Sequence, residues 1–257
     1  MASATTGMQK AYSWGYDECE FFPKAFAYIR QQQPHPVRLF AQVVVSRNHF
    51  SFDDNILDEN RPFATPANFA ERYLNSLGHQ DNCLEVFWRE FSAYAGENSH
   101  LFVFGDHSWP IGINGNSFNE TGAHPENFAV PILYIPPGNR CQEFAVGTRS
   151  DVWVAQADIP STILELLDLG HGSNSFASLL KGENTTSYED CHIVVQPYTD
   201  ASINVMRKGY EYAYHLSTQT LTRINLTESL AEGPEFVVAR QIPYSQFKSD
   251  YGCVRYR

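Results

Sequence analysis

The stretch Leu101-Phe102-Val103-Phe104-Gly105-Asp106-His107 predicts a buried β-strand that ends directly in polar residues. In open α/β sheets, ligands bind beyond the carboxyl ends of the strands, so Asp106 and His107 stand where a site is expected. One carboxylate oxygen and one imidazole nitrogen can together hold a divalent cation. The alternative interpretation is a loop carboxylate and a histidine that satisfy each other's hydrogen bonds.

A second group of candidate residues follows the β-branched run from Leu39 to Val45, which predicts a parallel strand buried on both faces. If this strand is parallel to the one before Asp106, His49 opens onto the same edge of the sheet. Its neighbour Arg47 can donate paired hydrogen bonds to an anionic oxygen of a sulfate or phosphate. A polar loop with a half-buried histidine is the alternative.

A long Gly- and Asn-rich loop separates His107 from the next predicted strand, residues 130–135. Loops of this length usually line a site or are mobile. His124, near the end of the loop, is a candidate for closing over a substrate, although a loop residue without a functional role is the simpler interpretation. Asp53 and Asp54 offer a reserve pair of metal-binding carboxylates, or else a solvated turn.

Helices are predicted between the strands. Apolar spacing indicates helices over residues 17–33 and 68–94, the second with a break near Gly78. A third helix is predicted over residues 158–170, with Asp158 as its cap. The alternation of strands and helices predicts an α/β sheet sandwiched by helices.

The residue pattern of the sequence changes after Gly182. Short strand-like runs separated by turn residues predict a small antiparallel sheet, with strands over residues 192–196, 202–207, 210–216 and 220–226. We therefore expect three parts: an α/β domain over residues 1–182, the antiparallel sheet over 183–230, and an irregular tail over 231–257.

Composition and charge exclude several classes of function. The 257 residues carry a formal charge of −11, with basic residues scattered, which disfavours binding to nucleic acid or to an anionic membrane. The five cysteines are far apart and odd in number, so we expect buried thiols rather than a zinc site or a disulfide framework. Neither a signal peptide nor a membrane-spanning run of about 20 apolar residues is found.

The order of six segments resembles the second half of the sulfatase branch of the alkaline phosphatase superfamily. The resemblance runs from Trp14 to Leu226 and is strongest to the lipoteichoic acid synthase and phosphoglycerol transferase group. The segments, in chain order, are WGYDECEFFPKAFAYI, RLFAQVVVSRNHFSF, FVFGDHSWP, PENFAVPILYIPPG, DIPSTILELLDLG and INVMRKGYEYAYHLSTQTLTRINL.

This resemblance implies roles for individual residues. Asp106 and His107 fall on ligands of one catalytic divalent metal ion, which the sequence leaves open as Ca, Mn or Zn. His49 falls on a substrate-contacting histidine, although Ser51 stands where the family usually has a proline. After His107 the sequence departs from the family, and Trp109 is expected to form part of a different substrate wall.

The resemblance also implies an absence, because no family nucleophile can be identified in the chain. The expected function is metal-dependent hydrolysis of a small-molecule, glycan-linked or lipid-linked sulfate ester. The nucleophile is then expected in a missing amino-terminal half, in cis or in trans. Phosphoglycerol-type transfer, phosphodiester hydrolysis and a non-catalytic binding module are the alternatives. Localisation stays open, with a secretory or membrane-associated site expected if the chain is part of a longer protein.

Overall fold

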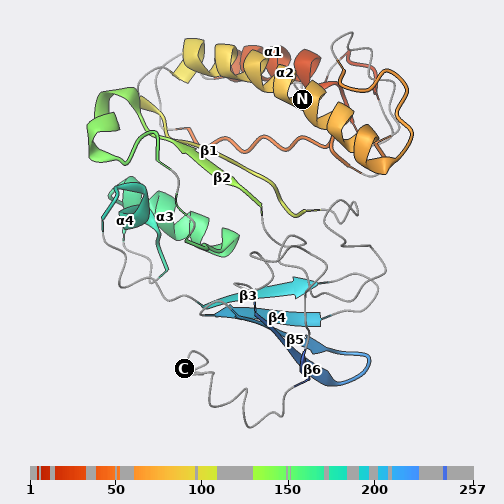
Figure 1. The fold of residues 1–257 in the computed structure, drawn as a ribbon. Coiled ribbons are helices and arrows are strands. Elements are labelled where there is room, and N and C mark those ends of the chain that lie inside the picture. The colour runs from red at the N-terminus through yellow and green to blue at the C-terminus, as the bar shows by residue number, and fades with distance from the viewer. Residues whose placement is uncertain are drawn as a thin grey trace. The chain divides into compact units, whose positions relative to one another are not determined.

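A computed structural model gives a mixed α/β chain that divides into two compact units (Figure 1). The first unit is Met1–Ser99 with Pro137–Asn139, and the second is His100–Pro136 with Arg140–Arg257. The structure describes residues 5, 7–11, 15–32, 39–49, 51–52, 61–95, 98–108, 130–148, 150, 152–170, 174–183, 191–196, 202–207, 210–225 and 240–241.

The first unit is built on two helices that lie side by side, α1 (Glu18–Gln32) and α2 (Phe69–Ala95). Their aromatic side chains interlock, with the ring of Phe87 5.1 Å from Phe22 and 5.5 Å from Phe26. At the far end of α1, Arg30 pairs with Glu90 at 3.0 Å. Because the contacts advance in the same direction along both helices, α1 and α2 run parallel.

Side-chain caps define where both helices begin. The Oδ1 atom of Asp17 accepts hydrogen bonds from the backbone N–H groups of Cys19 at 3.0 Å and Glu20 at 3.4 Å. The Oδ1 atom of Asn68 accepts a hydrogen bond from the N–H of Glu71 at 2.9 Å. In return, the Glu71 carboxylate accepts one from the N–H of Ala67 at 2.6 Å. The predicted start points are thus confirmed to within a residue.

Two predictions about this unit are wrong. Residues Leu39–Val45 form no strand, and Phe40 and Val44 are 75% and 73% exposed rather than buried. A strand needs hydrogen-bonding neighbours, and none of the described strands pairs with this run. The expected break near Gly78 is also missing, because α2 continues through it for 27 residues. The intrinsic cost of glycine in a helix, about 1 kcal/mol, is small beside the packing of a long apolar face.

The second unit begins with strands β1 (Leu101–Phe104) and β2 (Ile132–Ile135), as predicted, but they pair antiparallel and are only partly buried. Phe102 and Tyr134 face each other in register and pack against a small core of Phe144, Leu166 and Ala177.

Helices α3 (Ile159–Leu166) and α4 (Ala177–Leu180) complete this core. Two short 3-10 helices, η3 (Gly138–Glu143) and η4 (Gln156–Asp158), precede α3 along the chain. The fully buried Thr162 hydroxyl donates to the carbonyl of Asp158 at 2.8 Å and accepts from the N–H of Phe176 at 3.1 Å. Asp158 makes no side-chain cap, contrary to prediction, because η4 already precedes the helix.

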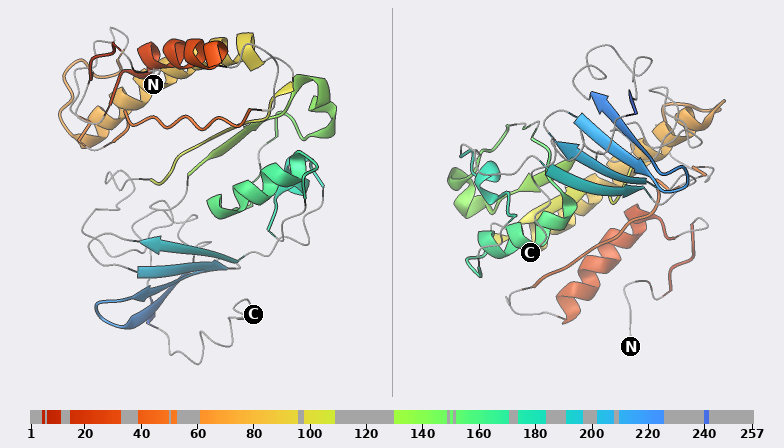
Figure 2. Two further views of the ribbon diagram at one scale, coloured as in Figure 1. Left: turned by 180° about the vertical axis from the view of Figure 1, so that it is seen from behind. Right: turned by 90° about the horizontal axis from the view of Figure 1, so that it is seen from below.

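The predicted small antiparallel sheet is confirmed (Figure 2). Five strands follow one another as neighbours in chain order, and Val205, Tyr212 and Ala213 are buried on it. The strands are β3 (Cys191–Gln196), β4 (Ser202–Arg207), β5 (Tyr210–His215), β6 (Thr220–Asn225) and β7 (Arg240–Gln241).

The cysteines differ from expectation. Cys19 and Cys83 form a disulfide that joins α1 to α2, and Cys141 is an exposed free thiol. Sequence spacing failed here because the two partners are 64 residues apart and meet only through helix packing. Among the described residues, no helix is both long and apolar enough to cross a membrane.

Candidate functional site

Asp106 and His107 lie directly after β1 and are both open to solvent. Their side chains are 87% and 47% exposed. Asp106 Oδ1 accepts a hydrogen bond from the backbone N–H of His107 at 2.9 Å, while Oδ2 lies 3.8 Å from His107 Nε2. That separation is longer than a hydrogen bond, so the two side chains lie close together without a hydrogen bond between these two atoms.

The imidazole orientation suits a metal ligand. His107 Nδ1 lies 3.0 Å from the backbone carbonyl of Ser108, and since a carbonyl only accepts, Nδ1 donates. In the neutral ring, Nε2 then carries the lone pair, which is the arrangement that metal-binding histidines adopt. Asp106 and His107 therefore fit as two ligands of a divalent ion, and a complete site needs further ligands.

The backbone at this corner is fixed by Gln156. Its side-chain amide donates to the carbonyl oxygens of Gly105 at 2.7 Å and Asp106 at 3.0 Å. Gly105 also permits a close approach, because a Cβ atom there would meet Val130 Cγ1 at 3.2 Å. The end of β1 is thus held by residues that are far from it in sequence.

Arg47 and His49, in the first unit, lie on a turn fixed by buried polar groups. Glu18, 2% exposed, accepts hydrogen bonds from the N–H groups of Arg47 at 2.9 Å and Ser46 at 3.3 Å. The buried Ser76 hydroxyl contacts the Arg47 carbonyl at 3.2 Å. As a result Arg47 is buried, at 3% exposed, whereas His49 is exposed.

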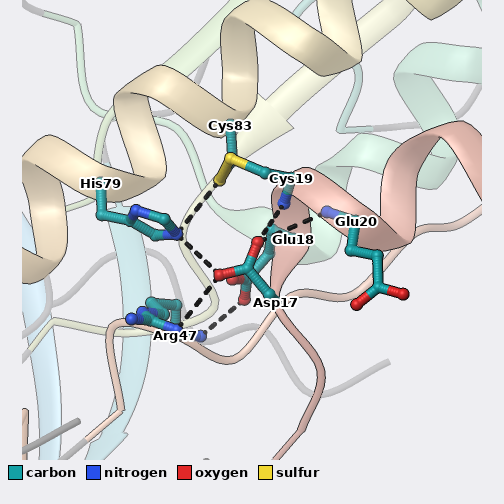
Figure 3. The surroundings of a disulfide bond; sticks show 7 residues. All are labelled: Asp17, Glu18, Cys19, Glu20, Arg47, His79 and Cys83. Atoms are coloured by element: carbon teal, nitrogen blue, oxygen red, sulfur yellow. Dashed lines mark hydrogen bonds and ion pairs between the residues drawn. A yellow bond between two sulfur atoms is a disulfide. The ribbon is translucent and has the colours of Figure 1, made fainter. Parts of the chain in front are cut away.

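The start of α1 carries a group of chemically reactive side chains that the sequence reasoning missed (Figure 3). We call Asp17, Cys19, His79 and Cys83 the helix-start cluster. His79 Nε2 lies 2.9 Å from Asp17 Oδ2 and 3.4 Å from Cys83 Sγ. The hydrogen bond from His79 holds the pKa of the Asp17 carboxyl below its usual value. The charges of His79 and Arg47 lower it further, against the effect of burial.

A signal for this cluster exists in the sequence. His79 and Cys83 are four residues apart, which places both on one face of a helix, and Asp17 and Cys19 flank the first residue of another helix. Of the other predicted site residues, Trp109 and His124 lie outside the described residues, as do Asp53 and Asp54.

Comparison of the sequence with models of protein families and with curated proteins finds no match. Solved structures do match. A protein in the alkaline phosphatase superfamily from Vibrio parahaemolyticus has a TM-score of 0.63 at 16% identity, covering 95% of this chain and 54% of its own.

Two further matching structures are of proteins with a named activity. The lipoteichoic acid synthase LtaP from Listeria monocytogenes has a TM-score of 0.61 at 14% identity, over 95% of this chain and 59% of its own. A 2-O GAG sulfatase has a TM-score of 0.50 at 16% identity, over 70% of this chain and 40% of its own. This chain thus spans about half the length of these proteins. The resemblance drawn from the sequence is confirmed at the level of fold: over the matched part, the chain shares the fold of sulfatases and other proteins of the alkaline phosphatase superfamily.

Proposed function

We propose that this chain supplies part of the metal and substrate site of an enzyme that hydrolyses a sulfate ester. The observation that carries the proposal is the exposed Asp106–His107 pair at the end of β1, on a fold shared with sulfatases. An exposed carboxylate and an imidazole with an oriented ring can bind a divalent ion without prior rearrangement.

In this proposal Asp106 and His107 hold one divalent ion, either Ca, Mn or Zn. When bound, such an ion neutralises charge on the oxygens of an ester. Gln156 acts as a positioning residue, because its two hydrogen bonds fix the backbone from which the ligands project.

The histidine at position 49 contacts the substrate in this proposal, either holding a non-bridging oxygen or protonating the leaving group. Its exposure and its rigid turn support such a role. We extend the substrate site to Arg47, Trp109 and His124 on the basis of sequence. Arg47 has an internal partner in the described structure, with its Nη1 atom 3.5 Å from Asp17 Oδ2. To bind substrate it would have to give up this partner.

The nucleophile is proposed to come from an amino-terminal half that is supplied in cis or in trans. The chain covers only 40 to 59% of the three matched structures described above, which leaves room in those folds for a further segment. The exposed apolar side chains of Leu39, Phe40, Val43 and Val44 support the idea, because a further segment packed on them would remove them from water.

Phosphoglycerol-type transfer or phosphodiester hydrolysis is the second candidate. The observation that favours it is the higher structural similarity to the lipoteichoic acid synthase, whose TM-score is 0.61 against 0.50 for the 2-O GAG sulfatase. Sulfate and phosphate esters are both tetrahedral oxyanions, so the same ligands suit either. A sulfatase-like binding module without catalysis is the third candidate.

The test uses the native protein, captured from its source with an antibody against this chain, and first measures its mass. It is then assayed on an aryl sulfate and an aryl phosphodiester. Asp106→Asn and His107→Ala are expected to lower turnover by more than about 100-fold, since even residues that only support metal ligands cost 10- to 100-fold. Asp81→Asn removes an exposed carboxylate on α2 and serves as the matched control. Full activity in the His107→Ala protein would overturn the assignment, and preference for the phosphodiester would select the second candidate.

A further inference from the structure

The helix-start cluster brings together four side chains with metal-binding atoms. One ligand atom from each of Asp17, Cys19, His79 and Cys83 lies within 4.8 Å of all the others. Two come from the start of α1 and two from successive turns of α2 (Figure 3). Because packing of the two helices already holds these atoms together, an ion that bound them would not have to order the chain.

We propose that, after reduction of the Cys19–Cys83 disulfide, these four residues bind one Zn²⁺ ion. A set of two thiolates, one imidazole and one carboxylate suits tetrahedral zinc better than the hard ions Mg²⁺ or Ca²⁺. The proposal uses neither Asp106 nor His107, and it does not depend on the proposed function.

The distances are close to those that zinc needs. Zinc bonds of about 2.0–2.1 Å to N or O and about 2.3 Å to S, at the tetrahedral angle, place the ligand atoms roughly 3.3–3.8 Å apart. His79 Nε2 is 3.4 Å from Cys83 Sγ and 2.9 Å from Asp17 Oδ2. These two distances need little change, whereas the sulfur atoms of Cys19 and Cys83 must move apart after reduction, by rotation of the two cysteine side chains.

The two oxygens of Asp17 have separate tasks. Oδ1 caps α1 by accepting the N–H groups of Cys19 and Glu20, while Oδ2 faces His79. Binding through Oδ2 leaves the helix cap intact. The nearby guanidinium of Arg47, 3.5 Å from Oδ2, compensates the single negative charge that Zn²⁺ retains with two thiolates and one carboxylate.

Binding is coupled to redox state because only thiolates are ligands. A dithiol reductant converts the disulfide to two cysteine thiols and is itself oxidised to a disulfide. Zn²⁺ then displaces one proton from each thiol to solvent. The proton that His79 Nε2 donates to Asp17 also leaves Nε2, to Nδ1 or to solvent, so that the neutral ring binds through Nε2 with its proton on Nδ1. The same two cysteines therefore join α1 to α2 either as a disulfide or through zinc, but not both at once.

The experiment measures zinc binding by the Asp106→Asn/His107→Ala protein, which removes the candidate ligands after β1. The protein is reduced with a phosphine, freed of reductant under nitrogen and titrated with Zn²⁺ against a chromophoric chelator. We expect one zinc per reduced chain and none in the oxidised chain. Cobalt(II) in place of zinc is expected to give thiolate-to-metal charge-transfer absorption and the visible bands of a tetrahedral site.

Matched variants identify the ligands. His79→Ala keeps both cysteines and is expected to weaken zinc binding by at least about 100-fold. Loss of a residue that only orients a metal ligand already costs up to about 100-fold in metal affinity, and loss of a ligand should cost at least as much. Cys141→Ser removes the exposed free thiol and is expected to change nothing. A Cys19→Ser/Cys83→Ser protein that is folded by circular dichroism yet binds zinc as tightly as the reduced parent would overturn the proposal. Absence of thiolate bands with cobalt would also overturn it.

Discussion

Two regions of the molecule each place a carboxylate beside a histidine, Asp106 beside His107 after β1 and Asp17 beside His79 at the start of α1. The first pair is separated by 3.8 Å and its carboxylate is 87% exposed. The second pair is hydrogen-bonded at 2.9 Å, and its carboxylate is 27% exposed and also caps a helix. The same residue types are thus exposed to solvent in one region and held by internal contacts in the other.

The largest effect on stability is expected from the disulfide that joins α1 to α2. Reduction in the presence of a chelator should lower the free energy of unfolding by about 2–4 kcal/mol, the usual range for a cross-link. Urea unfolding of the oxidised and reduced chain measures the difference. An unchanged midpoint would mean that the helix pair needs no cross-link.

A smaller loss is expected from Glu18, which supports the turn that carries His49. Glu18→Gln should cost about 2 kcal/mol, because a buried charged acceptor of two backbone N–H groups is replaced by a neutral one. Glu20→Gln is the matched control. It disturbs only an exposed pair with Lys24, which is worth roughly 0.3–0.5 kcal/mol. Equal losses in the two proteins would contradict the role given to Glu18.

Gln156 offers the corresponding test at the end of β1. In the native protein, Gln156→Ala should lower ester hydrolysis by about tenfold, the lower end of the range for residues that orient metal ligands. Unfolding should change by only about 1 kcal/mol, as expected for lost neutral hydrogen bonds. Unchanged hydrolysis with the same loss of stability would make Gln156 purely structural.

The smallest effect concerns pH. Because the folded pKa of Asp17 is lowered, its contribution to stability is fully present above its unfolded pKa, about 3.9, and is lost as pH falls through the folded value. Denaturant unfolding between neutral and acid pH should show a steeper loss in the wild-type chain than in His79→Ala. Parallel curves would show that the His79 contact does not set this pKa.

Regular periodicity in the sequence predicted most of the secondary structure. The apolar spacing gave α1 and α2, and the short runs after Gly182 gave β3 to β6 nearly to the residue. Local patterns decide these elements, because each is fixed by its own amphipathic face and its turns.

Tertiary contacts decided what the sequence missed. Gly78 predicts a helix break, but packing keeps α2 continuous. The run Leu39–Val45 predicts a strand, but no described strand pairs with it. The helix-start cluster joins residues of α1 and α2 that are more than 60 positions apart, and no local sequence pattern predicts a contact over that separation. The position of Asp106 and His107 behind a strand was predicted because a strand end is a local feature.

The most direct test of the central claim is the metal dependence of ester hydrolysis by the native protein, with and without the Asp106→Asn/His107→Ala change. The wild-type protein should lose hydrolysis after treatment with a chelator and regain it with Mn²⁺, Ca²⁺ or Zn²⁺, whereas the double variant should stay inactive with every ion. Full metal-dependent hydrolysis by the double variant would contradict the assignment of Asp106 and His107.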